Sequence, residues 1–140
     1  MSVEENKAII RHQHVEELFN KGNLAVADEI IAPDYIYHGP LGEFKGPEGV
    51  KQMVKTFRTA FPDVHFTIDD MVAEGDKVAV RYTWTGTFTG DLMGIAPTGK
   101  QVTMASAYFY RFADGKEVEA TPYADMLSFY QQLGISPPGG

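Results

Sequence analysis

Few side chains in this chain combine a titratable group with a setting that would use it for chemistry. His38 precedes the turn residues Gly39 and Pro40, and its imidazole could serve either as a hydrogen-bonding group at a cavity or as a local anchor of the loop. Asp125 would become a base if it were buried, because burial raises the pKa of a carboxyl group. We therefore name His38 and Asp125 as the two candidate acid-base residues.

The other titratable groups point to no common site. His12 and His14 are two residues apart on a predicted helix and so face different sides, while His65 stands alone on a predicted strand. The sequence has no cysteine, which excludes thiolate catalysis and thiolate metal ligands. We expect neither a metal site nor a cofactor. Glu117 and Glu119 are predicted to be solvated surface charges.

A larger group of residues could line a binding cavity. Because side chains alternate across a strand, Tyr82, Trp84 and Phe88 share one face of a predicted strand, and Tyr108 and Tyr110 share a face of the next. The following strand should add two more side chains unless Pro122 disturbs the alternation. The candidate ligand-binding residues are Phe19, His38, Met53, Phe57, Phe61, Tyr82, Trp84, Phe88, Tyr108, Tyr110, Thr121 and Tyr123.

These residues also have a purely structural explanation. Phe19, Phe57 and Phe61 could be ordinary core packing, since aromatic residues at regular spacing are usually buried. The hydroxyl groups of Tyr82 and Tyr110 could be satisfied by other protein groups rather than by a ligand. The sequence leaves both explanations open.

Two periodicities divide the chain into elements that would position these side chains. Helical spacing of apolar residues predicts helices over 8–22 and 47–61, with a short helix over 23–31 that Asn23 would cap. Strand patterns follow at 64–73, 77–88, 100–112 and 117–127, after a short extended segment at 35–38. Helices followed by antiparallel strands predict an α+β domain in which a curved sheet wraps around the helices.

Length and charge limit the classes of protein to consider. The 140 residues suit one domain, predicted over 1–136, with a flexible tail at 137–140. A net charge of -7 without a cluster of basic residues argues against nucleic acid as a partner. No apolar run approaches the roughly 18 residues that a membrane span requires, so no membrane partner is expected. The polar N-terminus lacks the features of a signal peptide, and we expect a cytoplasmic protein.

Several short motifs, in this order and spacing, resemble the SnoaL-like polyketide cyclases of the NTF2-like superfamily. They span roughly residues 5 to 135 and include His38-Gly39-Pro40, Gly46-Pro47-Glu48-Gly49-Val50, Phe61-Pro62-Asp63, Gly86-Thr87-Phe88-Thr89-Gly90 and Gln131-Gln132-Leu133-Gly134. The resemblance implies a cone-shaped fold with a deep apolar cavity between the sheet and the helices. Its members include polyketide cyclases, and more distant relatives are ketosteroid isomerases and binding modules, so the fold leaves function open.

The sequence departs from the resembled family where that family carries its chemistry. Phe88 stands where the family usually has a histidine, and Tyr108 stands where it typically has the aspartate that accepts a proton. A phenol with an ordinary pKa near ~10 is a poor base at neutral pH but a good hydrogen-bond donor. Ala120-Thr121 replaces a common His-Trp pair, which would enlarge the cavity.

These departures favour binding over catalysis. We expect a catalytically altered or redesigned pocket that binds a rigid, apolar, polycyclic small molecule, either steroid-like or polyketide-like. The alternative is an acid-base enzyme of the polyketide cyclase or ketosteroid isomerase type that uses His38 or Asp125. By analogy with the resembled family, a homodimer is expected.

Overall fold

The structure is a computed structural model that describes residues 2–40 and 42–136. The predicted tail at 137–140 lies outside the described residues. The described elements are α1 (Val3–Ala8), η1 (Ile9–Asn20), α2 (Val26–Ile30), β1 (Ile31–Gly39), β2 (Gly42–Lys45), α3 (Gly46–Ala60), β3 (His65–Glu74), β4 (Lys77–Thr87), β5 (Gln101–Ala113), β6 (Lys116–Ala124) and α4 (Met126–Leu133).

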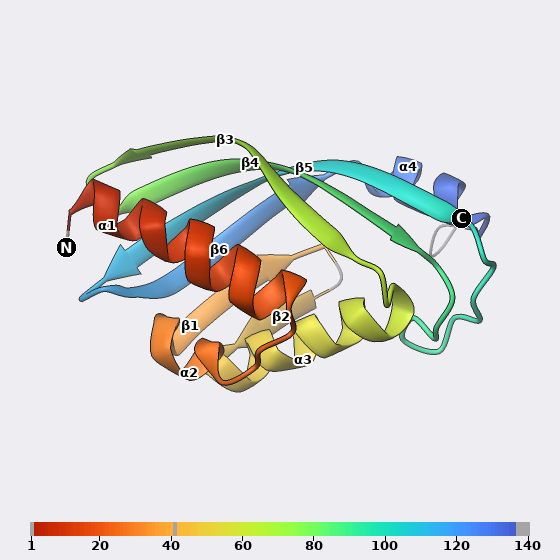
Figure 1. The fold of residues 1–140 in the computed structure, drawn as a ribbon, viewed down its shortest axis with the longest axis horizontal. Coiled ribbons are helices and arrows are strands. Elements are labelled where there is room, and N and C mark those ends of the chain that lie inside the picture. The colour runs from red at the N-terminus through yellow and green to blue at the C-terminus, as the bar shows by residue number, and fades with distance from the viewer. Residues whose placement is uncertain (1, 41, 137–140) are drawn as a thin grey trace.

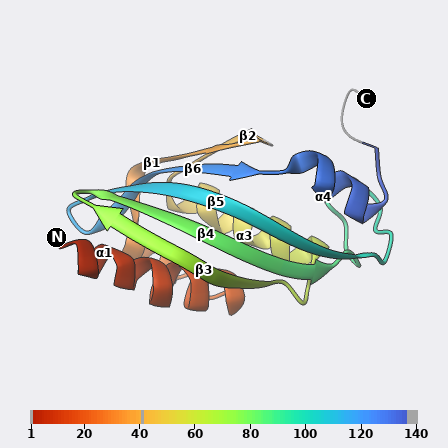
Figure 2. The same ribbon diagram turned by 90° about the horizontal axis from the view of Figure 1, so that it is seen from above.

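The strands form one six-stranded sheet in the order β2-β1-β6-β5-β4-β3. Neighbouring strands are antiparallel except for β1 and β6, which run parallel. The sheet curves over the helical layer of η1 and α3, and α4 lies at one end of β5 and β6 (Figures 1 and 2). The predicted α+β architecture, with a curved sheet around N-terminal helices, is confirmed.

The first helical stretch changes its winding along its length. Ser2 caps α1, and the Ser2 and Glu5 side chains satisfy each other's backbone N–H groups in a capping box. From Ile9 onward the stretch is a π-helix, and Ile10, His14 and Leu18, spaced four residues apart, lie on its buried face. This spacing places one histidine, His14, in the core.

The third predicted helix is confirmed as α3. Pro47 occupies its first turn, where the missing N–H has no intrahelical partner to lose. Val50, Met53 and Val54 are buried on the face toward the sheet. This helix forms the wall opposite the sheet.

Three local expectations need correction. The short helix α2 begins three residues after Asn23, with Ala25 at the cap position, so the Asn23 side chain does not cap it. The extended segment is longer than predicted, because β1 starts at Ile31 and carries Pro33. The last strand ends at Ala124, and residues predicted as strand at its end begin α4, a helix that the strand pattern did not predict.

No helix within the described residues is long and apolar enough to cross a membrane.

Candidate functional site

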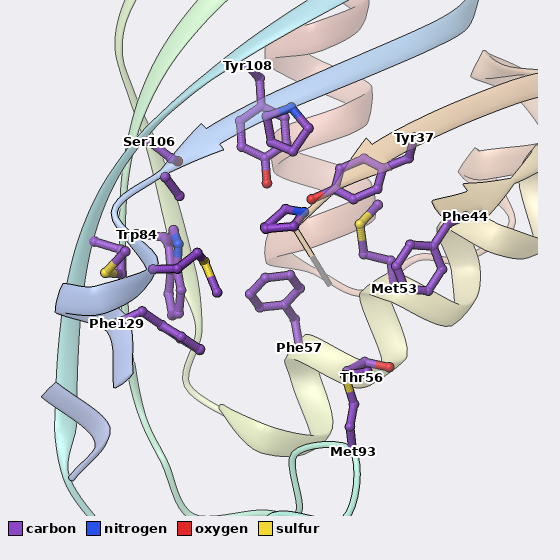
Figure 3. A pocket seen from close by; sticks show the side chains of 15 residues that line it. Tyr37, Phe44, Met53, Thr56, Phe57, Trp84, Met93, Ser106, Tyr108 and Phe129 are labelled. Carbon is purple, nitrogen blue, oxygen red and sulfur yellow. The ribbon is translucent and has the colours of Figure 1, made fainter. Parts of the chain in front are cut away.

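The main cavity lies between the concave face of the sheet and α3, and it encloses about 80 Å³. Trp84 of β4 and Tyr108 of β5 form the sheet side of its wall, while Met53 and Phe57 approach from α3 (Figure 3). The Phe57 and Trp84 rings meet edge to face with their centroids 5.4 Å apart. The structure thus brings together four of the predicted ligand-binding residues from two opposing layers.

Residues that the sequence prediction omitted complete this cavity. Tyr37 enters from β1, Ser106 from β5, and Phe129 from α4. Strand alternation already placed Ser106 on the same face as Tyr108, whereas Phe129 belongs to the helix that was not predicted. Four methionines also line the wall: Met53, Met93, Met104 and Met126.

The polar side-chain groups in the lining of the main cavity are hydroxyls and the indole N–H of Trp84. Tyr37 and Tyr108 have ring centroids 6.3 Å apart, and their hydroxyl groups point into the space between the layers (Figure 3). Burial raises the pKa of both phenols, and it raises the pKa of Tyr108 well above its ordinary value. Both tyrosines therefore stay protonated at neutral pH and can donate hydrogen bonds.

No described residue that lines the main cavity carries a carboxylate, an imidazole or a cationic group. Ser106 Oγ is buried and has no hydrogen-bond partner among the described residues. A buried hydroxyl group without a partner is costly, so it is a group that a ligand could satisfy. The arrangement suits recognition of oxygen atoms on an apolar molecule.

A second, smaller cavity of about 10 Å³, which we call the inner cavity, lies between η1 and strands β3, β4 and β5, and Tyr108 lines both cavities. Three more predicted residues, Phe19, Tyr82 and Tyr110, line this inner cavity. The hydroxyls of Tyr82 and Tyr110 are 2.8 Å apart and hydrogen-bond to each other. For these two tyrosines the structure therefore supports the explanation that the hydroxyl groups are hydrogen-bonded to other protein groups rather than to a ligand.

The inner cavity also holds a histidine that no sequence argument had singled out for this role. His14 Nδ1 lies 2.8 Å from Glu117 Oε2, and both side chains are buried. The prediction that Glu117 is a solvated surface charge is wrong. Glu117 pairs with Phe112, whose side chain is buried, so the Glu117 side chain lies on the inner face of the sheet. The β-bulge between Arg111 and Phe112 then adds one residue to β6 and shifts the alternation of the residues that follow.

The same register corrects the prediction for Thr121 and Tyr123. Tyr108 pairs with Pro122 and Ser106 pairs with Ala124, so the even-numbered residues of this part of β6 face the cavity. A shift of one residue moves every side chain to the opposite face. Thr121 and Tyr123 therefore lie on the outer face of the sheet, where Tyr123 is 62% exposed.

Phe61 and Phe88 belong to the closed core rather than to either cavity. Both are fully buried, and their ring centroids lie 5.7 Å apart. Phe61 packs directly over Gly86, where an added Cβ would come within 2.9 Å of the Phe61 Cβ. Glycine at this position lets the end of α3 approach β4 closely.

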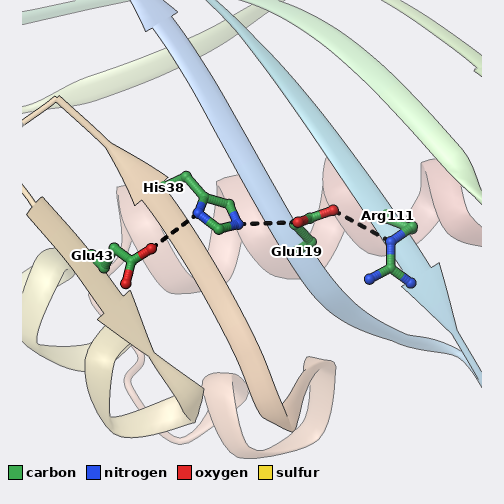
Figure 4. Close-up of polar contacts among 4 residues, drawn as sticks. All are labelled: His38, Glu43, Arg111 and Glu119. Atoms are coloured by element: carbon green, nitrogen blue, oxygen red, sulfur yellow. Dashed lines mark hydrogen bonds and ion pairs between the residues drawn. The ribbon is translucent and has the colours of Figure 1, made fainter.

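His38 lies outside both cavities and belongs to a chain of polar contacts (Figure 4). Its Nε2 is 3.0 Å from Glu119 Oε2 and its Nδ1 is 3.2 Å from Glu43 Oε2. Arg111 Nε donates to the other oxygen of Glu119 at 3.4 Å. The hydrogen bond from His38 is the main cause that lowers the pKa of Glu119. Of the two explanations for His38, the structure supports the structural anchor.

Asp125 is exposed and serves as the N-cap of α4. Its Oδ1 accepts a hydrogen bond from the Ser128 backbone N–H at 3.0 Å. The buried setting that would make Asp125 a base is absent. Neither candidate acid-base residue therefore faces the main cavity.

Comparison with known proteins agrees with this architecture. The family model described as SnoaL-like polyketide cyclase matches residues 10–133. The curated relative AcmA, an aklanonic acid methyl ester cyclase of Streptomyces galilaeus, is 30% identical over 125 residues, covering 84% of each chain. The aklanonic acid methyl ester cyclase DnrD of Streptomyces peucetius is 28% identical over 122 residues, again covering 84% of each.

Solved structures show the same fold. TsrD from Streptomyces laurentii superimposes with a TM-score of 0.86 at 25% identity, covering 97% of this chain and 99% of that chain. AclR from Streptomyces galilaeus gives a TM-score of 0.81 at 30% identity and covers 97% of this chain and 100% of that one. The chain belongs to the SnoaL-like polyketide cyclase family.

Proposed function

We propose that this protein binds a flat, apolar, polycyclic molecule that carries oxygen substituents, as aromatic polyketides do. The observation that carries the proposal is the lining of the main cavity, where hydroxyl donors face aromatic and thioether groups and no described residue offers a charge. Such a wall suits an uncharged ring system with a carbonyl or hydroxyl oxygen at its edge.

The shape of the cavity favours a thin ligand. Its volume of about 80 Å³ is well below the roughly 300–1,000 Å³ of common ligand pockets, so a polycyclic ligand must displace side chains. Met53, Met93 and Met126 are suited to this, because an unbranched thioether adapts to a new neighbour at low cost. Flat rings would need less displacement than a bulky steroid skeleton.

Titration of Trp84 fluorescence tests the proposal directly, since Trp84 is the single tryptophan and lines the cavity. A hydroxyanthraquinone should give a saturable change, and a steroid of similar mass should bind more weakly. If neither compound changes the emission of Trp84, the cavity is closed core and the proposal is wrong.

Replacing Tyr108 with Phe should weaken binding of the hydroxyanthraquinone about 3- to 10-fold. The change removes one hydrogen-bond donor, worth roughly 0.5–1.5 kcal/mol, and keeps the ring. Tyr123→Phe is the matched control, because it makes the same chemical change on the outer face. Equal affinities for Tyr108→Phe and the wild type would show that the Tyr108 hydroxyl group does not bind the ligand.

A second candidate is cyclisation of a polyketide ester, which is favoured by the curated relatives named as aklanonic acid methyl ester cyclases. His38 and Asp125 cannot act as its base on a ligand in the main cavity, because both lie outside it. Incubation with aklanonic acid methyl ester, followed by chromatography, separates the two candidates. Binding without turnover supports the binding function, and ring closure supports the enzyme.

A further inference from the structure

The inner cavity contains a continuous chain of hydrogen-bonding groups that the binding proposal does not use. Tyr82 and Tyr110 are linked at 2.8 Å, the Tyr110 hydroxyl lies 3.4 Å from His14 Nε2, and His14 Nδ1 lies 2.8 Å from Glu117 Oε2. These four side chains come from β4, β5, η1 and β6 and are buried. Buried polar groups brought together from four elements form a built site rather than incidental surface contacts.

The direction of the hydrogen bonds in this chain follows from the protonation states of its members, because each hydroxyl and each ring nitrogen can donate or accept. An ionised Glu117 can only accept, so His14 Nδ1 carries a proton, and Nε2 of a neutral imidazole is then an acceptor. Tyr110 donates to Nε2, and Tyr82 donates to the Tyr110 oxygen. The far end of the chain, the Tyr82 oxygen, is left as an acceptor toward the inner cavity.

Protonation of His14 at Nε2 reverses the links through Tyr110 and Tyr82, while Nδ1–H continues to donate to Glu117. The imidazolium donates from Nε2 to Tyr110, Tyr110 donates to Tyr82, and the Tyr82 O–H becomes a free donor toward the inner cavity. The chain can therefore accept a proton at one end and store it at the other. Glu117 balances the stored charge, because it is a buried carboxylate in direct contact with the imidazole.

The charged and titratable groups around His14 support storage of a positive charge. Glu117 from β6 is the nearest, Tyr110 from β5 and Tyr82 from β4 follow, and Phe19 of the same helix stacks on the ring. Glu117 Oε1 has no hydrogen-bond partner among the described residues, and neither has the Tyr35 hydroxyl of β1. The negative charge of Glu117 contributes to raising the pKa of Tyr35, after burial itself, so that phenol stays neutral.

Tyr108 separates this chain from the main cavity. It lines both spaces, and its ring meets Tyr82 edge to face with a centroid distance of 5.3 Å. A turn of this one side chain would join the two spaces. Because Tyr108 is the one described residue that lines both spaces, contact between a ligand in the main cavity and the Tyr82 oxygen requires this turn.

From this geometry we infer that the site takes ligands with an acidic phenol or enol and binds them as anions, with His14 as the proton acceptor. The ligand O–H bond breaks and its proton goes to the Tyr82 oxygen. The Tyr82 proton passes to Tyr110, and the Tyr110 proton passes to His14 Nε2. The products are a ligand oxyanion, which accepts a hydrogen bond from Tyr82, and an imidazolium paired with Glu117. This inference rests on the proposed binding function and names its ligand class.

The test uses emodin, a flat hydroxyanthraquinone whose absorption moves to longer wavelength when a phenol ionises, at a pH where the free dye is neutral. Trp84 fluorescence reports binding, and dye absorbance reports ionisation, so the two can fail separately. Bound dye with the spectrum of the anion supports the inference. Bound dye with the neutral spectrum overturns the inference and leaves the binding function intact. If the dye does not bind, both the binding function and the inference are wrong.

Calorimetry in two buffers with different ionisation enthalpies locates the proton. If His14 accepts it, the proton stays inside the complex and the binding enthalpy is the same in both buffers. If the enthalpy follows the buffer, because the dye releases its proton to solvent, His14 is not the acceptor and the inference is wrong.

Variants test whether ionisation of the bound dye depends on the hydrogen-bond chain of Tyr82, Tyr110 and His14. His14→Gln should lower the ratio of anionic to neutral bound dye at least about tenfold, equivalent to one pKa unit. His12→Gln, which removes an exposed imidazole two residues away, should leave the ratio unchanged. If His14→Gln does not fold, Tyr110→Phe breaks the chain and leaves the His14–Glu117 pair in place. A normal anion signal in Tyr110→Phe would overturn the inference.

Discussion

Single side chains in this protein take their roles from their partners rather than from their residue type. Asp63 illustrates this, because it follows Pro62 just after the end of α3 and takes its role from Thr87. Its two oxygens accept hydrogen bonds from the Thr87 backbone N–H and the Thr87 hydroxyl, both at 2.7 Å. These bonds fasten the end of β4 and lower the pKa of Asp63.

The Asp63 contacts predict an acid-sensitive part of the stability. Because the folded pKa is lower than the unfolded value of about 4, the contribution is present above that pH and is lost as pH falls below it. Asp63→Asn should therefore lower the unfolding free energy at neutral pH more than at low pH. Urea denaturation at pH 7 and near pH 3 measures the difference.

The control for this experiment is Asp34→Asn, which changes an exposed carboxylate to which no described side chain or backbone N–H is seen to donate. It should leave the pH dependence of stability unchanged. A parallel loss of stability at both pH values in Asp63→Asn would mean that the carboxylate charge is not what Thr87 recognises. Solvent screening keeps the expected difference small, since Asp63 lies at the surface.

Among the elements, α4 has the greatest consequence for the cavity, because it supplies Met126 and Phe129 to the wall. It spans only eight residues, so its stability depends on the residues that cap its two ends. Asp125 caps its start, and Gly134 ends it in the left-handed conformation with φ 76°. Loss of either end would loosen one side of the binding cavity.

Asp125→Ala should destabilise the protein by about 1 kcal/mol, the usual value of an N-cap. Asp125→Ser should restore most of the loss, because serine also caps helices well. Thermal unfolding of the three proteins measures the effect. If Asp125→Ala instead abolished turnover of a polyketide ester at unchanged stability, the acid-base role that the sequence suggested for Asp125 would return.

The molecule as a whole presents an apolar outer face. Val72, Ala79, Phe109 and Thr121 are aligned across four strands by the register of the sheet, and Tyr123 packs against Phe109. Val72 is 61% exposed and Phe109 is 54% exposed. Large apolar side chains gathered on one exposed face are typical of a contact surface between proteins.

We therefore expect the predicted homodimer to form through this outer face. Phe109→Asp should shift the sedimentation coefficient from dimer to monomer by placing an unpaired charge in the contact. Leu127→Asp is the matched control, since Leu127 is similarly exposed but lies on α4. A wild-type chain that sediments as a monomer at every concentration would exclude the dimer.

Local patterns in the amino-acid sequence were enough to predict the layers and one wall of the cavity. Helical and strand periodicities depend on short-range geometry, so they placed α3 and the four long strands within a few residues. Alternation along β4 and β5 put Trp84 and Tyr108 on the same face, and both line the main cavity. The order of short motifs also indicated the family that the comparisons show.

Which side chains come into contact could not be predicted from those patterns, because it depends on how distant segments pack. The bulge opposite Arg111 put Glu117 and Thr121, four residues apart, on opposite faces of β6, and the packing of η1 against the sheet brought His14 to Glu117, 103 residues away in sequence. A bulge has no periodic signal, because it is one extra residue, and neither has the contact of a helix with a distant strand. Contacts between distant strands depend on register and curvature, and those are set by how the whole sheet packs against the helices.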